Sequence, residues 1–133
     1  MIFPPGSQVE IKRGAISLAE IRWSLLMTQR KLRAILEKLR EQLGALYGDK
    51  LYRLILYGSQ ARGDSEVGSD IDVLVVLEGL IKPYQEIART EFIVADLSLS
   101  YDVVIACVFV SRIRYETHHG PLLLNVRREG VAI

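Results

Sequence analysis

Three short apolar runs, separated by polar segments, organise the part of the chain that follows residue 50. They cover 51–57, 70–77 and 102–110, and they are rich in Leu, Ile and Val. Apolar runs of this length, with many β-branched residues, are typical of buried strands. These segments are therefore expected to form a small sheet.

Helical patterns separate and follow these strands. Gly79 and Pro83 mark a connection into a helix predicted over about 84–98. A final helix is predicted to begin at Pro121, because proline is favoured at the first helical position, and to end before Gly130.

A much longer helix is predicted over 17–47, ahead of the first strand. Ser17 and Glu20 have the spacing of a capping box, and Gly48 supplies a C-terminal stop. Apolar residues at steps of three and four form one face, at Leu18, Ile21, Leu25, Leu32, Ile35, Leu39 and Leu46. A continuous helix of about 30 residues would be roughly 45 Å long.

The apolar stripe of this helix has two interpretations. Such a stripe usually packs against a sheet, and the C-terminal half of the helix can do so. Trp23, Leu26 and Met27 spread apolar surface around the N-terminal half, which is more than one sheet can cover. A homodimer through this helix, or docking to a helical partner, would explain that surface.

The order helix, strand, strand, helix, strand, helix predicts an α/β (α+β) fold, a small mixed β-sheet with helices packed on it. At 133 residues the chain has the length of one domain. We expect a loosely ordered extension over 1–16, with a possible strand at 9–11, and a single domain over 17–133. That domain comprises the long helix and a core over 51–133.

Charge is unevenly distributed although the formal net charge is only +1. Residues 1–62 carry 11 Lys and Arg against 5 acids, whereas residues 63–111 carry 2 against 9. The basic part could receive an acidic partner or be a solvated helix. No continuous basic stripe indicates direct binding to nucleic acid.

The single cysteine and the apolar runs bear on location. Cys107 lies within an apolar strand, which predicts a buried, inert thiol and no internal disulfide. The first residues lack the pattern of a signal peptide, and no apolar run approaches the ~20 residues needed to cross a bilayer. We therefore expect a soluble, cytoplasmic protein without membrane contact.

Two aspartates, Asp70 and Asp72, stand at the start of the second apolar run. Side chains alternate along a strand, so both carboxylates point the same way. Adjacent carboxylates beside a buried strand repel each other and lose hydration, and a cation would relieve that repulsion. Hard oxygen ligands of this kind suit Mg²⁺, which binds through one or two carboxylates together with substrate phosphates.

Gly58 and Ser59 follow the first strand directly and supply a candidate phosphate-binding turn. Glycine lets the chain bend and lets its amide approach a ligand closely, and the Ser59 hydroxyl could hold phosphate oxygens. Arg62 offers a planar set of donors for the same anion. A Gly-Ser pair alone usually marks a turn, and a lone Asp-x-Asp is usually a solvated strand edge. Their combination, each attached to its own strand, favours a functional site.

Gly58-Ser59, ten intervening residues and Asp70-Ile71-Asp72 resemble the signature of the nucleotidyltransferase superfamily related to DNA polymerase beta. The wider string, with GSQARG followed by SDID, is similar to the minimal nucleotidyltransferases of HEPN/MNT toxin–antitoxin pairs. The resemblance extends from roughly residue 51 to the C-terminus. It implies the nucleotidyltransferase fold.

The resemblance also implies a third carboxylate on a neighbouring strand. Asp102, which opens the third apolar run within Tyr101-Asp102-Val103-Val104, is the best candidate, although it could instead mark a turn. Asp70, Asp72 and Asp102 would then be the catalytic, metal-binding residues, with Gly58, Ser59 and Arg62 binding the nucleotide phosphates.

These roles imply a reaction. Two Mg²⁺ ions would assist attack of a hydroxyl on the α-phosphorus of a nucleoside triphosphate, with ATP as the donor and pyrophosphate leaving. The resemblance implies that the acceptor is a tyrosine of a HEPN-type helical toxin, for which this chain would be the antitoxin. Transfer to a small molecule such as an antibiotic, or neutralisation of a partner by binding alone, are the alternatives.

One further spacing is misleading. Arg114 and His119 fit the R-x4-H form of HEPN ribonucleases, and Arg112 and His118 fit the R-x5-H form. Those motifs function within an all-helical dimer, whereas here they follow a strand. We interpret all four as loop residues.

Overall fold

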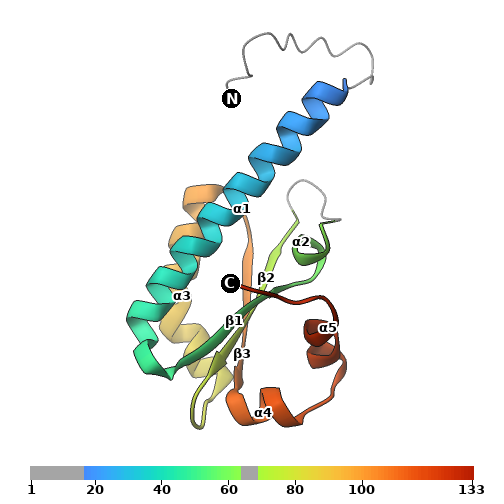
Figure 1. Ribbon diagram of the computed structural model, residues 1–133. Coiled ribbons are helices and arrows are strands. Elements are labelled where there is room, and N and C mark those ends of the chain that lie inside the picture. The colour runs from blue at the N-terminus through green and yellow to red at the C-terminus, as the bar shows by residue number, and fades with distance from the viewer. Residues whose placement is uncertain (1–16, 64–68) are drawn as a thin grey trace. The chain divides into compact units, whose positions relative to one another are not determined.

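The computed structural model describes residues 17–63 and 69–133 (Figure 1). The chain divides into two compact units, residues 1–34 and 35–133. The boundary falls inside one continuous helix. The predicted extension over 1–16, with its possible strand, lies outside the described residues, so the predicted domain limits stay a prediction.

Helix α1, Leu18–Tyr47, forms as predicted. Its capping box is present. The Glu20 amide donates a hydrogen bond of 3.2 Å to the Ser17 hydroxyl, and the Ser17 amide donates one of 3.3 Å to the Glu20 carboxylate. In the second unit Ile35, Leu39 and Leu43 are buried. Leu46, which was predicted on this stripe, is exposed. A 3₁₀ turn, η1 over Gly48–Lys50, ends the helix.

The sheet is mixed, as predicted, and has four strands in the order β3-β2-β1-β4. The strands are β1 (Leu51–Tyr57), β2 (Ile71–Leu77), β3 (Ile105–Ser111) and β4 (Val131–Ala132). β1 pairs antiparallel with β2 and β4, and β2 pairs parallel with β3. β2 is therefore central, and the side chains of 73–77 are fully buried.

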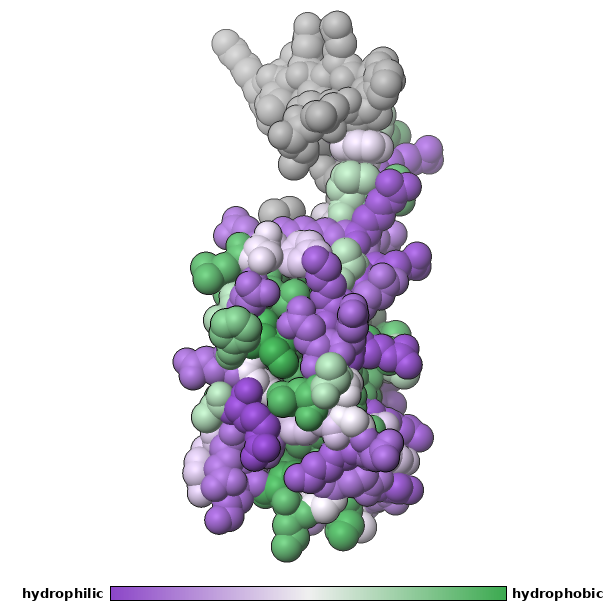
Figure 2. Space-filling view, turned by 90° about the vertical axis from the view of Figure 1, so that its left-hand side faces the viewer, coloured by the Kyte–Doolittle hydropathy of each residue, from purple (hydrophilic) through white to green (hydrophobic). Residues whose placement is uncertain are grey.

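Helices cover both faces of this sheet (Figure 1). They are α2 (Ser59–Arg62), α3 (Pro83–Tyr101), α4 (Arg112–Thr117) and α5 (Pro121–Glu129). Leu123 and Val126 of α5 pack in one cluster with Ile55, Leu74 and Val110 of the sheet. Figure 2 shows the side that carries α1 and α3, where hydrophobic side chains stand among hydrophilic ones.

The structure corrects three details of the sequence prediction. Strand β3 begins at Ile105 instead of 102, because α3 continues to Tyr101 and Asp102 caps it in a left-handed conformation. Arg112 and Arg114 belong to α4, so their interpretation as loop residues was wrong. The short elements α2, α4 and β4 were not predicted. Among the described residues, no helix is long and apolar enough to span a bilayer.

Candidate functional site

The chain turns sharply where β1 ends. Gly58 has φ 76° and ψ −157°, a combination that is open essentially to glycine alone. Its carbonyl accepts the amides of Ala61 and Arg62, both at 3.1 Å, so the short helix α2 begins immediately at Ser59. The turn therefore fixes the main chain at Gly58 and Ser59 beside the end of the sheet.

Gly58 also lies directly against a carboxylate of the next strand. Tyr57 is paired with Asp72 across β1 and β2. A Cβ atom added to Gly58 would lie 2.6 Å from Oδ2 of Asp72, closer than real contacts allow. Two independent constraints, the backbone angles and this contact, therefore require glycine at position 58.

Asp70 lies directly before β2 and Asp72 is the second residue of that strand, close enough for the charge of Asp70 to act on the Asp72 carboxyl. Ile71 between them is buried, and its amide donates to the Val104 carbonyl at 2.8 Å. Asp70 is exposed and Asp72 is half-buried. The structure brings these two aspartates together with Gly58 and Ser59 at one end of the sheet, where β1 ends and β2 begins.

The negative charges of Asp70 and Asp72 act on each other and on the neighbouring Tyr57, as shifts in pKa show. Burial, and secondly the negative charge of Asp70, raise the pKa of the Asp72 carboxyl above its ordinary value. Burial, followed by the charge of Asp72, likewise raises the pKa of the Tyr57 phenol. Negative charge is thus unfavourable here until a cation neutralises it.

The donor set fits a hard divalent cation. Asp72 is partly desolvated, and among the described residues no basic side chain lowers its pKa. A close pair of carboxylates of this kind matches the way Mg²⁺ uses few protein ligands. In residues 17–63 and 69–133, no group of three or more His, Cys, Asp or Glu side chains is arranged to hold a metal ion. The fit therefore rests on Asp70 and Asp72.

Asp102, the predicted third carboxylate, lies at the end of α3, three residues before β3. It has φ 52° and ψ 54°, a left-handed conformation that Asp tolerates better than most residues. β2 and β3 pair in parallel, with Ile71 opposite Ile105 and Asp72 opposite Ala106. Asp102 therefore lies near the same end of the sheet as the two aspartates. The structure does not place it in a three-carboxylate cluster with them, and its catalytic role stays a prediction.

Arg62, predicted to bind phosphate, is held at the end of α2. Its Nη1 atom forms an ion pair with Oε1 of Glu129 on α5, at 3.0 Å. Gln60 of the same helix donates to the Ser69 carbonyl at 3.3 Å, which ties α2 to the segment that leads into β2. Sequence analysis missed both anchors. Glu129 lies 67 residues from Arg62, and no local pattern connects them.

The remaining residues singled out in the sequence lie elsewhere. Arg112 is bound to Glu78 and Glu116, and its guanidinium stacks on the Tyr52 ring at 4.1 Å. Arg114 is on α4, whereas His118 and His119 lie between α4 and α5. These arginines and histidines come from different elements than the two aspartates and do not contribute a HEPN-type arrangement.

Comparison with known proteins identifies the family of this chain. Residues 36–124 match the family model described as a nucleotidyltransferase domain. The match contains Gly58, Ser59, Asp70, Asp72 and Asp102. It covers more than half of the chain.

Two curated proteins of Methanocaldococcus jannaschii, each named "putative protein adenylyltransferase", are similar in sequence. One is 34% identical over 80 residues, which are 59% of this chain and 78% of the relative. The other is 30% identical over 101 residues, which are 76% of this chain but only 60% of the relative.

The fold is similar to that in a crystal structure described as a toxin–antitoxin with AMP-PNP. The TM-score is 0.52 at 24% identity, and the similarity covers 72% of this chain and 69% of the other. At that identity the likeness concerns the fold. Together, the family match and the sequence relatives establish that this chain belongs to the nucleotidyltransferase domain family and is a nucleotidyltransferase.

Proposed function

We propose that this nucleotidyltransferase moves AMP from ATP to a hydroxyl group of a partner protein. The observation that carries the proposal is the placement of Asp70 and Asp72 beside the glycine turn at Gly58 and Ser59, within a chain of this family. The names of the two sequence relatives support adenylylation of a protein.

The reaction exchanges a phosphoanhydride bond of ATP for a phosphoester bond to the acceptor. The acceptor oxygen forms a bond to the α-phosphorus, the bond from that phosphorus to the bridging oxygen of the β-phosphate breaks, and pyrophosphate leaves with the electron pair. The acceptor proton passes to a nearby base, a role we assign to Asp102. Bound Mg²⁺ would neutralise the charge of the phosphates and polarise them.

The residues of the chain would share the remaining work. Asp70 and Asp72 would hold the cation, and Gly58 keeps the main chain close to the Asp72 carboxylate without a steric clash. The Ser59 hydroxyl and neighbouring amides would receive phosphate oxygens. Glu129 holds the guanidinium of Arg62 at the end of α2, from where Arg62 would contact the same phosphates.

We further propose that the acceptor is a tyrosine of a HEPN-type helical toxin, and that the chain acts as its antitoxin. The likeness to a toxin–antitoxin crystallised with AMP-PNP supports this proposal. In the first unit, the helix exposes Leu18, Ile21, Leu25 and Leu26. This apolar surface would suit the toxin or a second copy of the chain.

A labelling experiment tests the proposal. The purified protein is incubated with each α-³²P-labelled nucleoside triphosphate, Mg²⁺, and the protein encoded beside it. We expect label on the partner protein with ATP, and none when EDTA removes the cation. Mass spectrometry then identifies the modified residue.

Asp70→Asn and Asp72→Asn provide the catalytic controls, and Asp96→Asn, an exposed aspartate on α3, is the matched neutral change. Label should disappear in the first two variants and persist in the third. Neutralisation of the toxin by Asp70→Asn without any transfer would contradict an enzymatic antitoxin. Transfer only to a small molecule would contradict a protein acceptor.

A further inference from the structure

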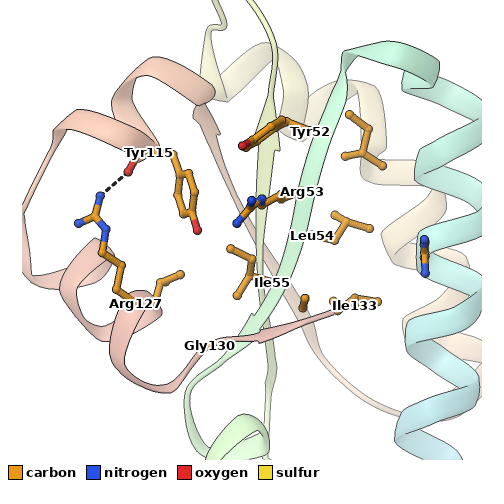
Figure 3. Close-up of a pocket in the computed structure, with 12 residues that line it drawn as sticks. Tyr52, Arg53, Leu54, Ile55, Tyr115, Arg127, Gly130 and Ile133 are labelled. Atoms are coloured by element: carbon orange, nitrogen blue, oxygen red, sulfur yellow. Dashed lines mark hydrogen bonds between the residues drawn. The ribbon is translucent and has the colours of Figure 1, made fainter.

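A groove of about 480 Å³ runs along the free side of β1, at the edge of the sheet (Figure 3). Its floor is formed by β1 over 51–55. Tyr115 of α4 and Arg127 of α5 lie on one side of β1, and α1, which carries Arg40, lies on the other (Figure 3). Gly130, Ala132 and Ile133 also line the groove. None of these residues belongs to the nucleotidyltransferase site described above.

The floor of the groove is an incompletely paired strand edge. β4 pairs with Ile55 and Leu56 only, and the Ile133 amide donates to the Leu54 carbonyl at 3.0 Å. The edge thus already accepts one short strand, and among the described residues no further strand lies beside its continuation at 51–53. A peptide strand added there would extend the sheet.

The walls of the groove are basic and aromatic. Arg40, Arg53 and Arg127 are exposed, and none of the three forms an ion pair with a carboxylate in the part of the chain that the structure describes. The Arg53 guanidinium lies 5.0 Å from the centre of the Tyr52 ring.

Arg127 is oriented by main-chain acceptors instead of by a carboxylate. Its guanidinium donates to the carbonyls of His118, at 2.9 Å, and Tyr115, and it lies 5.9 Å from the Tyr115 ring centre. By contrast, Arg62, Arg89 and Arg112 elsewhere in the same unit all have acidic partners. The groove therefore concentrates positive charge that the chain itself does not neutralise.

We propose that this groove binds an acidic, extended peptide segment of a partner protein, which pairs antiparallel with β1 in line with β4. Alternate side chains of a strand point to opposite faces, so acidic residues would reach Arg40 on one side and Arg53 and Arg127 on the other. Backbone pairing would give affinity and the arginines would select the charge. The proposal is independent of nucleotide transfer.

A binding assay with a defined probe tests this site. The probe is a fluorescent eight-residue peptide in which Glu-Glu pairs alternate with Val-Val pairs, so that carboxylates lie on both faces of the extended strand. Its polarisation is followed as the full chain is added. We expect saturable binding that weakens at least about tenfold in Arg53→Glu and in Arg40→Glu. Arg128→Glu, an exposed arginine of α5 outside the groove, makes the same change in charge and should bind like the unmodified protein.

Matched probes separate strand pairing from simple attraction of charge. A peptide of the same sequence with alternate backbone nitrogens methylated should lose binding, and a Lys-Val peptide should not bind. Undiminished binding of the methylated peptide, or equal weakening by Arg128→Glu, would overturn the proposal.

Two further outcomes would assign the groove to another occupant and equally overturn the proposal. One is displacement of the probe by ATP or by a short single-stranded RNA. The other is a dimer, measured by light scattering, that Arg53→Glu dissociates. Circular dichroism of each variant checks that the fold is kept. Absence of probe binding to the unmodified protein would also overturn the proposal.

Discussion

Asp72 is held in conditions that oppose its own charge. Its carboxyl is half-buried, it lies near Asp70, and Gly58 packs against Oδ2. Burial and the charge of Asp70 raise its pKa. A carboxyl whose pKa is higher in the folded state than in the unfolded state stabilises the fold below its unfolded pKa. That stabilisation is lost as the pH rises through the folded pKa.

We therefore predict that Asp72→Asn makes the cation-free protein more stable at pH 7 while abolishing transfer. The neutral amide removes repulsion and desolvated charge, and gains of about 0.5–1 kcal/mol are common for such substitutions. Urea unfolding measures the free energy of unfolding. Asp96→Asn should leave both stability and transfer unchanged, and a less stable Asp72→Asn would contradict the prediction.

The acid limb of the pH–rate profile should reflect the same raised pKa. Because the ionised form of Asp72 would hold the cation, nucleotide transfer should fall at a higher pH than for an ordinary aspartate. The measurement is transfer rate against pH at a fixed low Mg²⁺ concentration. Raising the Mg²⁺ concentration should move this limb to lower pH, since the cation favours the ionised form. A limb that does not respond to Mg²⁺ would contradict this assignment.

Replacement of Gly58 by alanine should reduce both stability and activity. The added Cβ would meet Oδ2 of Asp72, and the backbone angles are unfavourable for any L-residue, at a cost of about 1–3 kcal/mol. Gly44→Ala is the matched control, because Gly44 lies inside α1 with no atom within 4 Å of the added Cβ. That control should gain about 0.5–1 kcal/mol in the free energy of unfolding.

Cys107 should react slowly in the folded protein. The Cys107 side chain is half-buried, whereas the sequence predicted a buried thiol. Its loss of hydration raises the pKa of the thiol to about 12. At pH 8 the nucleophilic thiolate is therefore scarcer than in a free cysteine, and alkylation by iodoacetamide should be at least about a hundredfold slower. The same chain in denaturant is the control and should react at the ordinary rate. Rapid reaction of the native protein would contradict the described burial.

At the scale of elements, α1 and α3 are joined by a buried polar link. The Tyr47 hydroxyl donates to Oε2 of Glu86 at 2.7 Å, and Arg89 lies 3.4 Å from the same carboxylate oxygen. Glu86 is only 4% exposed. Its carboxylate is therefore stabilised by these two partners.

Tyr47→Phe should lower the free energy of unfolding by about 1–2 kcal/mol. The change removes one hydrogen bond to a buried charge and leaves Arg89 as its remaining partner. Tyr84→Phe, on an exposed tyrosine of α3, is the control and should have little effect. Chemical denaturation of both variants makes the comparison. Equal stability of the two would show that the link contributes nothing.

The longer elements could be predicted from the sequence because each carries a repeated pattern. β1 and α5 have the predicted bounds, since a continuous apolar run marks the first and Pro121 and Gly130 mark the second. The short elements α2 and α4 contain too few turns to show periodicity. β4 has two residues and exists only through pairing with Ile55 and Leu56.

The candidate site was predictable to the same extent. Gly58, Ser59, Asp70 and Asp72 adjoin strands that pair with each other, so the local sequence was enough to bring them together. The ion pair of Arg62 with Glu129, and the groove lined by Arg40, Arg53 and Arg127, arise where α1, α5 and β4 fold onto the sheet. Such long-range contacts leave no signal in the spacing of residues.

At the scale of the whole chain, the core lies in one unit. Every buried apolar residue of the described chain falls between Ile35 and Val126, inside the unit over 35–133. We predict that a chain beginning at Ile35 folds by itself. It should show cooperative thermal unfolding, measured by circular dichroism, and dispersed amide signals in NMR. A chain without cooperative unfolding would contradict this prediction.

The packing of Gly58 against Asp72 also limits how this protein can vary. Any single-base change at the first or second position of a glycine codon introduces a side chain or a stop. Each such change at position 58 would therefore meet both the contact with Asp72 and the unfavourable backbone angles. Since replacing Gly58 also costs stability, even a lineage that abandons catalysis should keep this glycine.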